Sequence, residues 1–237
     1  MNILSIFRDS LIILRMHKHI AAPTIIVSLT ITILSVILIM NPLGEEAGTQ
    51  LKTIKDLEPI MGRFITIGLL DFFLQIFTQA MVISMVMDVI DKKGCSIKIA
   101  FLSAFSRLNA LFSSVLFLGT LLFAGMLLLF LPAVIVAYFF MFTIVILMND
   151  RSTNAFTAMK LSYLLVRHNL NSAIMFFLSL ITLGLIVTLF NIMVSSIPGI
   201  GQIIPSITMG IYMAFGGVAL LLAYREIVHN VLQNPIK

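Results

Sequence analysis

Residues 110–148 read ALFSSVLFLGTLLFAGMLLLFLPAVIVAYFFMFTIVILM, and this stretch contains no charged side chain. A helix needs about 20 apolar residues to cross the hydrocarbon core of a bilayer, so the stretch is long enough for two crossings. Pro132 divides it, and proline is favoured at the start of a helix and disfavoured in its interior. The sequence therefore predicts one transmembrane span over residues 110–131 and a second over residues 132–148.

Four more apolar runs predict spans at about residues 21–40, 59–90, 172–195 and 203–223. The first run follows a basic start, as in a secretory signal, but it ends in Asn41-Pro42-Leu43-Gly44 without a small-x-small cleavage site. We therefore expect it to be retained as a span. The expected fold is all-α: a polytopic membrane protein with six transmembrane helices in a single membrane domain, residues 1–237.

The composition agrees with lipid as the solvent of this chain. Hydrophobic residues make up 60% of it, charged residues only 11%, and its mean hydropathy is +1.12. A soluble domain carries about 25% charged residues, so a soluble protein of this size could not cover so much apolar surface. We expect the net charge of +5 to come from loops that face anionic lipid headgroups, and not to indicate binding of nucleic acid.

The distribution of basic residues predicts the orientation, because short cytoplasmic loops are rich in Lys and Arg. The other side of the six spans receives only Lys52 and Lys55, with Arg63 near its edge. We therefore expect both termini in the cytoplasm and the Leu43–Glu58 connection outside. The basic residues on the cytoplasmic side are Arg8, Arg15, Lys18, Lys92, Lys93, Lys98, Arg107, Arg151, Lys160, Arg167, Arg225 and Lys237.

A stretch with the pattern of an amphipathic helix precedes spans one, three and five, which gives a threefold rhythm of helix plus hairpin. Such helices lie at the headgroup level, with Lys and Arg reaching outward. Anionic headgroups at the cytoplasmic face are therefore expected partners. The residues that share an apolar face are Ile3, Leu4, Phe7, Leu11 and Leu14 in the first stretch, Ile97, Phe101, Ala104, Phe105 and Leu108 in the second, and Phe156, Met159, Tyr163 and Val166 in the third.

Asp71 is the acid that lies well inside a span, where a carboxylate costs about 2.5–3.5 kcal/mol on insertion scales. Gln75 lies one turn further along span two, and Arg63 lies two turns before Asp71. One interpretation is a polar cavity or a proton- or ion-responsive acid. The alternative is a structural carboxylate that pairs with Arg63 or with a hydroxyl of a neighbouring helix.

Small and hydroxyl residues form stripes on other spans. They allow membrane helices to approach closely and to hydrogen-bond, so helix-packing seams are one interpretation. A vestibule shared by spans one, two and five is the other, and Asn191 would then belong to the Asp71 site. The stripes are Thr24, Ser28, Thr32 and Ser35 in span one, Gly184, Thr188, Asn191 and Ser195 in span five, and Gly210, Ala214 and Gly217 in span six.

The sequence contains no motif that predicts catalysis. It has no Gly-rich phosphate loop ending in Lys-Ser/Thr, no HExxH and no GxSxG. Its four histidines (His17, His19, His168 and His229) are scattered along the cytoplasmic boundary. We therefore expect no enzymatic activity, no cofactor and no metal.

From about Leu57 onward the chain resembles the YciC-type family of bacterial inner-membrane proteins, which has no established activity. The resemblance implies a bacterial inner-membrane location and six spans, and it implies no functional residues. It rests on Gly94-Cys95-Ser96, Leu131-Pro132, Asn149-Asp150-Arg151, Phe156-Thr157-Ala158-Met159-Lys160-Leu161-Ser162 with Leu165 and Asn169, Pro198 with Ile200-Gly201, and Tyr224-Arg225. In its longest stretch we expect Phe156 and Met159 to face lipid, and Ser162 and Asn169 to bond neighbouring helix ends.

Three functions follow as hypotheses. The first is a non-enzymatic protein that organises the membrane or envelope through its amphipathic helices. The second is a small permease or transporter component with a polar site around Asp71, Gln75, Arg63 and Asn191. The third is a lipid-modifying enzyme, which would need a polar cluster such as His168 with Asp150.

Overall fold

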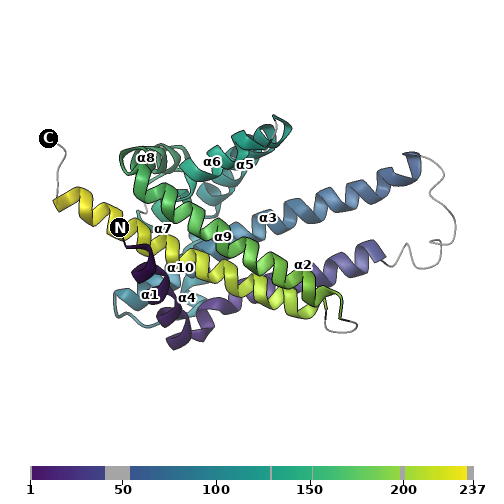
Figure 1. Cartoon of the computed structure of the whole chain (residues 1–237), viewed down its shortest axis with the longest axis horizontal. Coiled ribbons are helices and arrows are strands. Elements are labelled where there is room, and N and C mark those ends of the chain that lie inside the picture. The colour runs from purple at the N-terminus through teal and green to yellow at the C-terminus, as the bar shows by residue number, and fades with distance from the viewer. Residues whose placement is uncertain (1, 41–53, 129, 151, 198–200, 234–237) are drawn as a thin grey trace.

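The computed structural model describes residues 2–40, 54–128, 130–150, 152–197 and 201–233, and within these ranges the chain contains no strand (Figure 1). Within the described residues, six segments are long and apolar enough to cross a membrane, which confirms the all-α polytopic fold and the predicted number of spans. The predicted Leu43–Glu58 connection lies largely outside the described residues. The six segments are Lys18–Leu38, Ile65–Ile90, Leu108–Leu127, Leu131–Asn149, Leu170–Ser195 and Ile203–His229.

Four long helices lie side by side in the bundle. They are α2 (Ala22–Ser35), which continues a short 3-10 turn (Lys18–Ala21) and runs into a π-helical segment (Val36–Met40), α3 (Ile54–Ile90), α9 (Leu170–Ser195) and α10 (Ile203–Gln233). Helix α3 begins at Ile54, so Pro59 lies inside the helix and not before it as expected. Helix α10 packs against each of the other three and forms the centre of the bundle.

Small residues allow these helices to approach closely, as the seam interpretation predicts. A Cβ added at Gly210 would lie 2.6 Å from the Cα of Ile25, so α2 and α10 touch backbone to backbone there. The Thr24 hydroxyl donates a hydrogen bond to the Gly210 carbonyl at 2.7 Å. At Gly217 an added Cβ would lie 2.5 Å from the Gln79 side-chain oxygen of α3. Such contacts are the usual means of helix association in lipid.

Spans three and four form a hairpin that diverges from the four-helix bundle (Figure 1). It consists of α5 (Leu108–Leu127), α6 (Leu131–Phe140) and α7 (Thr143–Asn149). Span four is therefore broken between Phe140 and Thr143, although the sequence predicts a continuous helix. The hydroxyl of Ser162 accepts a hydrogen bond from the Phe142 N–H at 3.2 Å and donates one to the Phe139 carbonyl at 2.9 Å. It thereby satisfies backbone groups at the break, as a membrane protein requires.

Three shorter helices lie at the end of the bundle where α1 begins and α10 ends, which we call the basic end. They are α1 (Ile3–Met16), α4 (Ile97–Ser106) and α8 (Ala155–His168), and each turns small residues toward the bundle. Met159 is buried, so the expectation that it faces lipid is wrong, whereas Phe156 is exposed. The buried small residues are Ser10 on α1, Ala100 and Ala104 on α4, and Ala155, Ala158 and Ser162 on α8.

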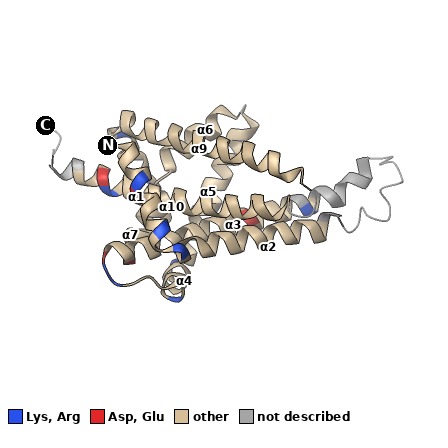
Figure 2. Ribbon diagram, turned by 60° about the horizontal axis from the view of Figure 1, so that its bottom comes forward, with Lys and Arg blue, Asp and Glu red and all other residues tan. Residues whose placement is uncertain are grey.

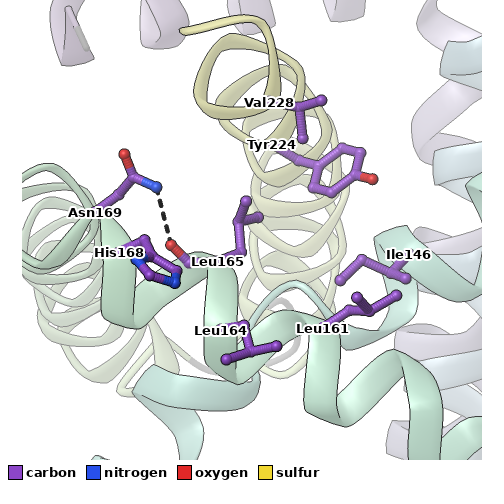
Figure 3. Close-up of a pocket in the computed structure, with 8 residues that line it drawn as sticks. All are labelled: Ile146, Leu161, Leu164, Leu165, His168, Asn169, Tyr224 and Val228. Carbon is purple, nitrogen blue, oxygen red and sulfur yellow. Dashed lines mark hydrogen bonds between the residues drawn. The ribbon is translucent and has the colours of Figure 1, made fainter. Parts of the chain in front are cut away.

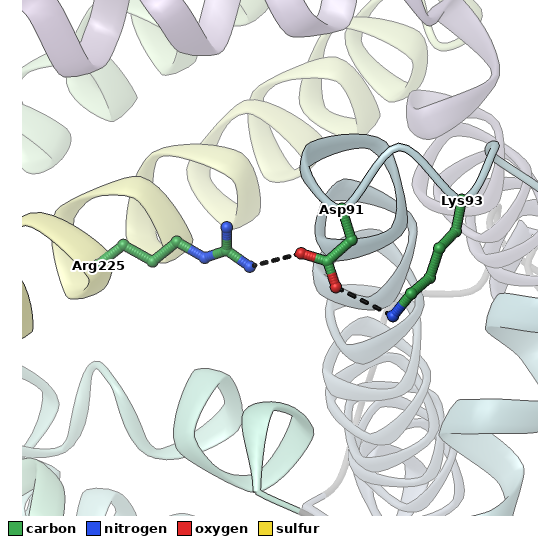
Figure 4. A network of polar contacts seen from close by, with 3 residues as sticks. All are labelled: Asp91, Lys93 and Arg225. Atoms are coloured by element: carbon green, nitrogen blue, oxygen red, sulfur yellow. Dashed lines mark hydrogen bonds and ion pairs between the residues drawn. The ribbon is translucent and has the colours of Figure 1, made fainter.

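Among the described residues, lysine and arginine gather at the basic end, and few lie toward the opposite end (Figure 2). One ion-pair network there joins the end of α3 to α10 (Figure 4). The Asp91 carboxylate lies 3.1 Å from the Lys93 amine and 3.7 Å from the Arg225 guanidinium. The hydrogen bond from Lys93, together with the charge of Arg225, lowers the pKa of Asp91 below its ordinary value.

The turn between α7 and α8 is closed by Arg107, which reaches it from the α4–α5 junction. The Arg107 guanidinium donates hydrogen bonds to the carbonyls of Leu147 at 2.7 Å, Thr153 at 3.3 Å and Asp150. The Asp150 carboxylate accepts bonds from Ser152 and Thr153 within the turn. These bonds, that from the Thr153 hydroxyl first, lower the pKa of Asp150 to about 2.

Candidate functional site

Four helices enclose an open cavity of about 300 Å³ in the half of the bundle opposite the basic end. They are α2, α3, α9 and α10, the four long helices of the bundle, and the cavity lies between the end of α9 and the beginning of α10. Three of the four predicted site residues meet there. The lining residues are Ser28, Ile31 and Thr32 from α2, Asp71 and Gln75 from α3, Asn191 from α9, and Pro205, Ser206 and Met209 from α10.

Asp71 and Gln75 form the polar wall that α3 contributes. They lie one turn apart, and the Gln75 side-chain amide donates a hydrogen bond to the Asp71 carboxylate at 3.2 Å. Among the described residues, this is the hydrogen bond that the Asp71 side chain accepts. The predicted pairing of Asp71 with Arg63 is wrong: the Arg63 guanidinium donates to the Leu38 carbonyl at 3.2 Å. Residues 63 and 71 are about 12 Å apart along a helix, which is too far for the pair.

Several oxygen atoms around the cavity lack a partner. Among the described residues, the Ser28 hydroxyl, the Gln75 side-chain oxygen and the Asn191 side-chain oxygen are buried and have no hydrogen-bond partner. Ser28 itself is 7% exposed. Buried polar atoms in native proteins are nearly always hydrogen-bonded, and an unsatisfied one calls for an explanation. Three of them around one cavity, beside a carboxylate, indicate a place where a ligand or water completes the bonding.

The hydroxyls of Thr32 and Ser206 form another polar part of the cavity lining. They lie 2.7 Å apart, and each also lies within hydrogen-bond distance of a carbonyl on its own helix, Thr32 with Ser28 and Ser206 with Gln202. A hydroxyl has one hydrogen to donate. Two hydrogens therefore serve three acceptors, so one of these close contacts lacks a hydrogen of its own.

The remaining lining is apolar and includes residues that the sequence analysis missed. Ile31, Pro205 and Met209 contribute it, so the cavity has a polar side and an apolar side. The sequence pattern predicts only a packing stripe on span six and does not identify Pro205, Ser206 and Met209 as lining residues. Their signal in the sequence was weak, because periodicity identifies a helix face but not the helices that pack against it.

Below the cavity, toward the basic end, α3 becomes apolar and tightly packed. Gln79 follows Gln75 by one turn and donates a hydrogen bond to the Met213 carbonyl of α10 at 2.7 Å. Val82, Ile83 and Val86 then lie at 0–1% exposure in the core. Most of the buried residues of α3 beyond Gln79 are therefore apolar.

The predicted stripes of small and hydroxyl residues lie partly in helix-packing seams and partly at the cavity. In span one, Thr24 belongs to the seam, while Ser28 and Thr32 line the cavity. In span five, only Asn191 reaches the cavity, and Thr188 and Ser195 are exposed. Gly184 instead makes room for Tyr212 of α10, whose hydroxyl donates to the Leu180 carbonyl at 3.0 Å.

A second cavity, of about 290 Å³, lies between α8 and α10 at the basic end (Figure 3). Aliphatic side chains line most of it, together with His168, Asn169 and Tyr224, and Asn169 donates to the Leu165 carbonyl at 3.0 Å. Asp150 does not line it, and the described residues show no bond between His168 and Asp150. Nor do they contain a group of three His, Cys, Asp or Glu residues that could hold a metal ion.

Comparisons with protein-family models, with curated proteins and with solved structures find no match to this chain. The resemblance to the YciC-type family therefore stays a prediction. The class of protein that the fold and the cavity define is a polytopic helical membrane protein with a polar cavity inside its bundle.

Proposed function

We propose that the protein is a small permease or transporter component that binds a polar solute in the cavity around Asp71. The observation that carries this proposal is the convergence of Asp71 with the unpartnered oxygens of Ser28, Gln75 and Asn191 from three different helices. Binding sites of secondary transporters lie inside the bundle between helices. A ligand cavity typically combines apolar walls with a few placed polar groups, and a volume of about 300 Å³ lies at the small end of that range.

The asymmetry of the bundle supports the same proposal. The cavity is open, whereas Val82, Ile83 and Val86, which follow Gln79 on α3 toward the basic end, are buried in the core. A carrier alternates between states that are open on one side only. This arrangement fits one such state.

We further propose that the protein is not an enzyme and lies in the bacterial inner membrane with its termini in the cytoplasm. The cavity offers a single carboxylate, and no residue that lines it forms a pair of nucleophile and base. The gathering of Lys and Arg at one end supports the orientation. The resemblance to the YciC-type family supports the location.

A membrane-organising role is the second candidate, and the exposed apolar residues of α1, α4 and α8 favour it. Leu4 is 81% exposed, Phe105 56% and Phe156 69%, and basic residues such as Lys98 and Lys160 lie on the same helices. Side chains of this kind suit contact with acyl chains and anionic headgroups. If no solute binds and deletion alters the membrane composition or envelope integrity, this role replaces the first.

A thermal-unfolding screen in lipid nanodiscs tests the proposed function. The panel contains small cationic, neutral and anionic polar solutes, and the proteins are wild type, Asp71→Asn and Asp88→Asn. Asp88 is the matched control because it lies on α3 but does not line the cavity. We expect at least one solute to raise the unfolding temperature of wild type and Asp88→Asn but not of Asp71→Asn. A panel without any such solute overturns the proposal.

A further inference from the structure

The cavity contains buried side-chain oxygens that can accept hydrogen bonds from a ligand. The Gln75 amide is oriented by its own bond to Asp71, because its nitrogen donates to that carboxylate at 3.2 Å. Its oxygen therefore points elsewhere, is buried and lacks a partner, as does the oxygen of Asn191. The carboxylate of Asp71 can accept further bonds, because an ionised carboxylate has about four acceptor positions. A ligand that satisfies these oxygens must carry hydrogen-bond donors.

The charge of the cavity points to a single positive charge on that ligand. Asp71 contributes the one formal charge among the lining residues, and the other polar ones are neutral amides and hydroxyls. The nearest basic residue on the same helix, Arg63, is engaged with the Leu38 carbonyl. A monovalent cation neutralises the site, whereas a divalent cation would leave an uncompensated charge in a medium of low dielectric constant.

The shape of the cavity points to a cation that carries a hydrocarbon body. About 300 Å³ is far more than one bare metal ion occupies, and Ile31, Pro205 and Met209 line it with apolar surface. A primary ammonium group donates three hydrogen bonds, as the lysine amine does. Three donors match the carboxylate of Asp71 and the oxygens of Gln75 and Asn191, and the Ser28 hydroxyl adds a further acceptor.

On this basis, and resting on the proposed function, we propose that the cavity binds a primary ammonium ion with a short apolar body. The ammonium lies against Asp71, Gln75 and Asn191, and the body lies against Ile31 and Met209. This chemistry has two sources in a bacterial membrane: a free alkylamine, and the headgroup of an aminophospholipid. The experiment separates them.

The probe is n-butylammonium, measured by thermal unfolding and by calorimetric titration of the full chain in phosphatidylcholine nanodiscs, which carry no primary amine. Butanol, butyrate and sodium ion are the comparison probes. We expect saturable binding of n-butylammonium to wild type and Asp88→Asn, and an affinity at least about tenfold lower for Asp71→Asn, because a hydrogen-bonded charge is lost. Asn191→Ala, on the sparsely packed α9, provides a second variant and is expected to weaken binding severalfold.

The outcomes are distinct. Phosphatidylcholine is then replaced by phosphatidylethanolamine. If this lipid raises the unfolding temperature of wild type and competes with n-butylammonium, the site binds the lipid headgroup. If it does neither, the site binds a free amine. Binding that needs Asp71 but prefers butanol, butyrate or sodium ion overturns the ammonium proposal and leaves the proposed function standing. If no probe and no solute of the wider panel binds, both fall.

Discussion

Two carboxylates of this protein differ in the donors that surround them. Asp150, in the turn at the basic end, accepts bonds from the Ser152 N–H at 2.9 Å and from the hydroxyls of Ser152 and Thr153 at 2.7 Å each. Asp71, inside the bundle, accepts one bond, at 3.2 Å from Gln75. The first carboxylate is satisfied by its own turn and has a structural role. The Asp71 carboxylate can accept further hydrogen bonds, and an unsatisfied carboxylate inside a membrane bundle is energetically costly.

The Asp150 turn predicts a loss of stability in acid. Its pKa of about 2 lies below the ordinary value of about 3.9, so the unfolded chain binds the proton more readily than the folded one. Its contribution to stability is complete above about pH 4 and is lost as the pH falls toward 2. We expect the unfolding temperature of wild type in nanodiscs to fall more steeply between pH 4 and pH 2 than that of Asp150→Asn. Equal slopes for the two proteins would contradict this assignment.

The close contact at Gly210 predicts that a larger side chain there destabilises the packing of α2 against α10. Replacement of Gly210 by alanine places a Cβ 2.6 Å from the Cα of Ile25, and backbone cannot yield as a side chain does. We expect Gly210→Ala to destabilise the fold by about 1–3 kcal/mol, the usual range for overpacking. Gly216→Ala is the matched control, because an added Cβ there meets nothing within 4 Å. Unfolding of both variants in nanodiscs checks the difference, and equal stability would mean that the two helices are not in close contact.

Among the elements, span four is distinctive because it is built from two helices. The break between α6 and α7 consists of Met141 and Phe142, without glycine or proline. Ser162 of α8 bonds both sides of it. Helix α8 thus holds the middle of a span, and the sequence prediction that Ser162 bonds a neighbouring helix end is confirmed.

Removal of the Ser162 hydroxyl is expected to destabilise this junction. Ser162→Ala leaves the Phe142 N–H without its partner in a buried position, which costs about 1–3 kcal/mol. Ser179→Ala is the control, since the Ser179 hydroxyl bonds only the carbonyl of Met175 on its own helix. Hydrogen exchange at residues 139–143 reads out the local effect. Unchanged protection in Ser162→Ala would show that the hydroxyl does not hold the break.

The sequence predicts the spans well because each depends on a long apolar run, and the end of α9 at Ser195 and the beginning of α10 at Ile203 follow from it. It does not predict the break in span four, since the residues at the break are as apolar as their neighbours. Met159 was assigned to lipid for a similar reason. Hydropathy favours the large residue, but the inward face of α8 is set by Ala158 and Ser162, whose small size allows close packing and draws Met159 inward with them.

The site was predicted in part. Asp71 and Gln75 follow from helical spacing on a single span, and Asn191 from a stripe on another. Ser206 and Met209 could not be predicted, because their place beside Asp71 depends on the order of helices around α10, and that order is a property of the packed bundle. The error with Arg63 has a simpler cause, since two turns of helix separate it from Asp71.

At the scale of the whole molecule, the basic end predicts the orientation in the membrane. In a Cys95→Ser background, we expect Ser196→Cys, in the turn after α9, to react with a membrane-impermeant maleimide in intact cells. Ser106→Cys, at the end of α4, is expected to react only after the cells are opened; both serines are exposed. The reverse pattern would invert the topology and place the cavity toward the cytoplasm.

The most direct test of the central claim measures whether charged solutes reach the cavity and respond to Asp71. In the Cys95→Ser background, Asn191→Cys is treated with a cationic and with an anionic methanethiosulfonate reagent, and Leu189→Cys, exposed on the same helix but outside the cavity, is the control. We predict that Asn191→Cys reacts about tenfold or more faster with the cationic reagent, that Asp71→Asn abolishes this preference, and that Leu189→Cys, facing lipid, reacts with neither. Failure of Asn191→Cys to react, or a reaction indifferent to Asp71, would contradict the account.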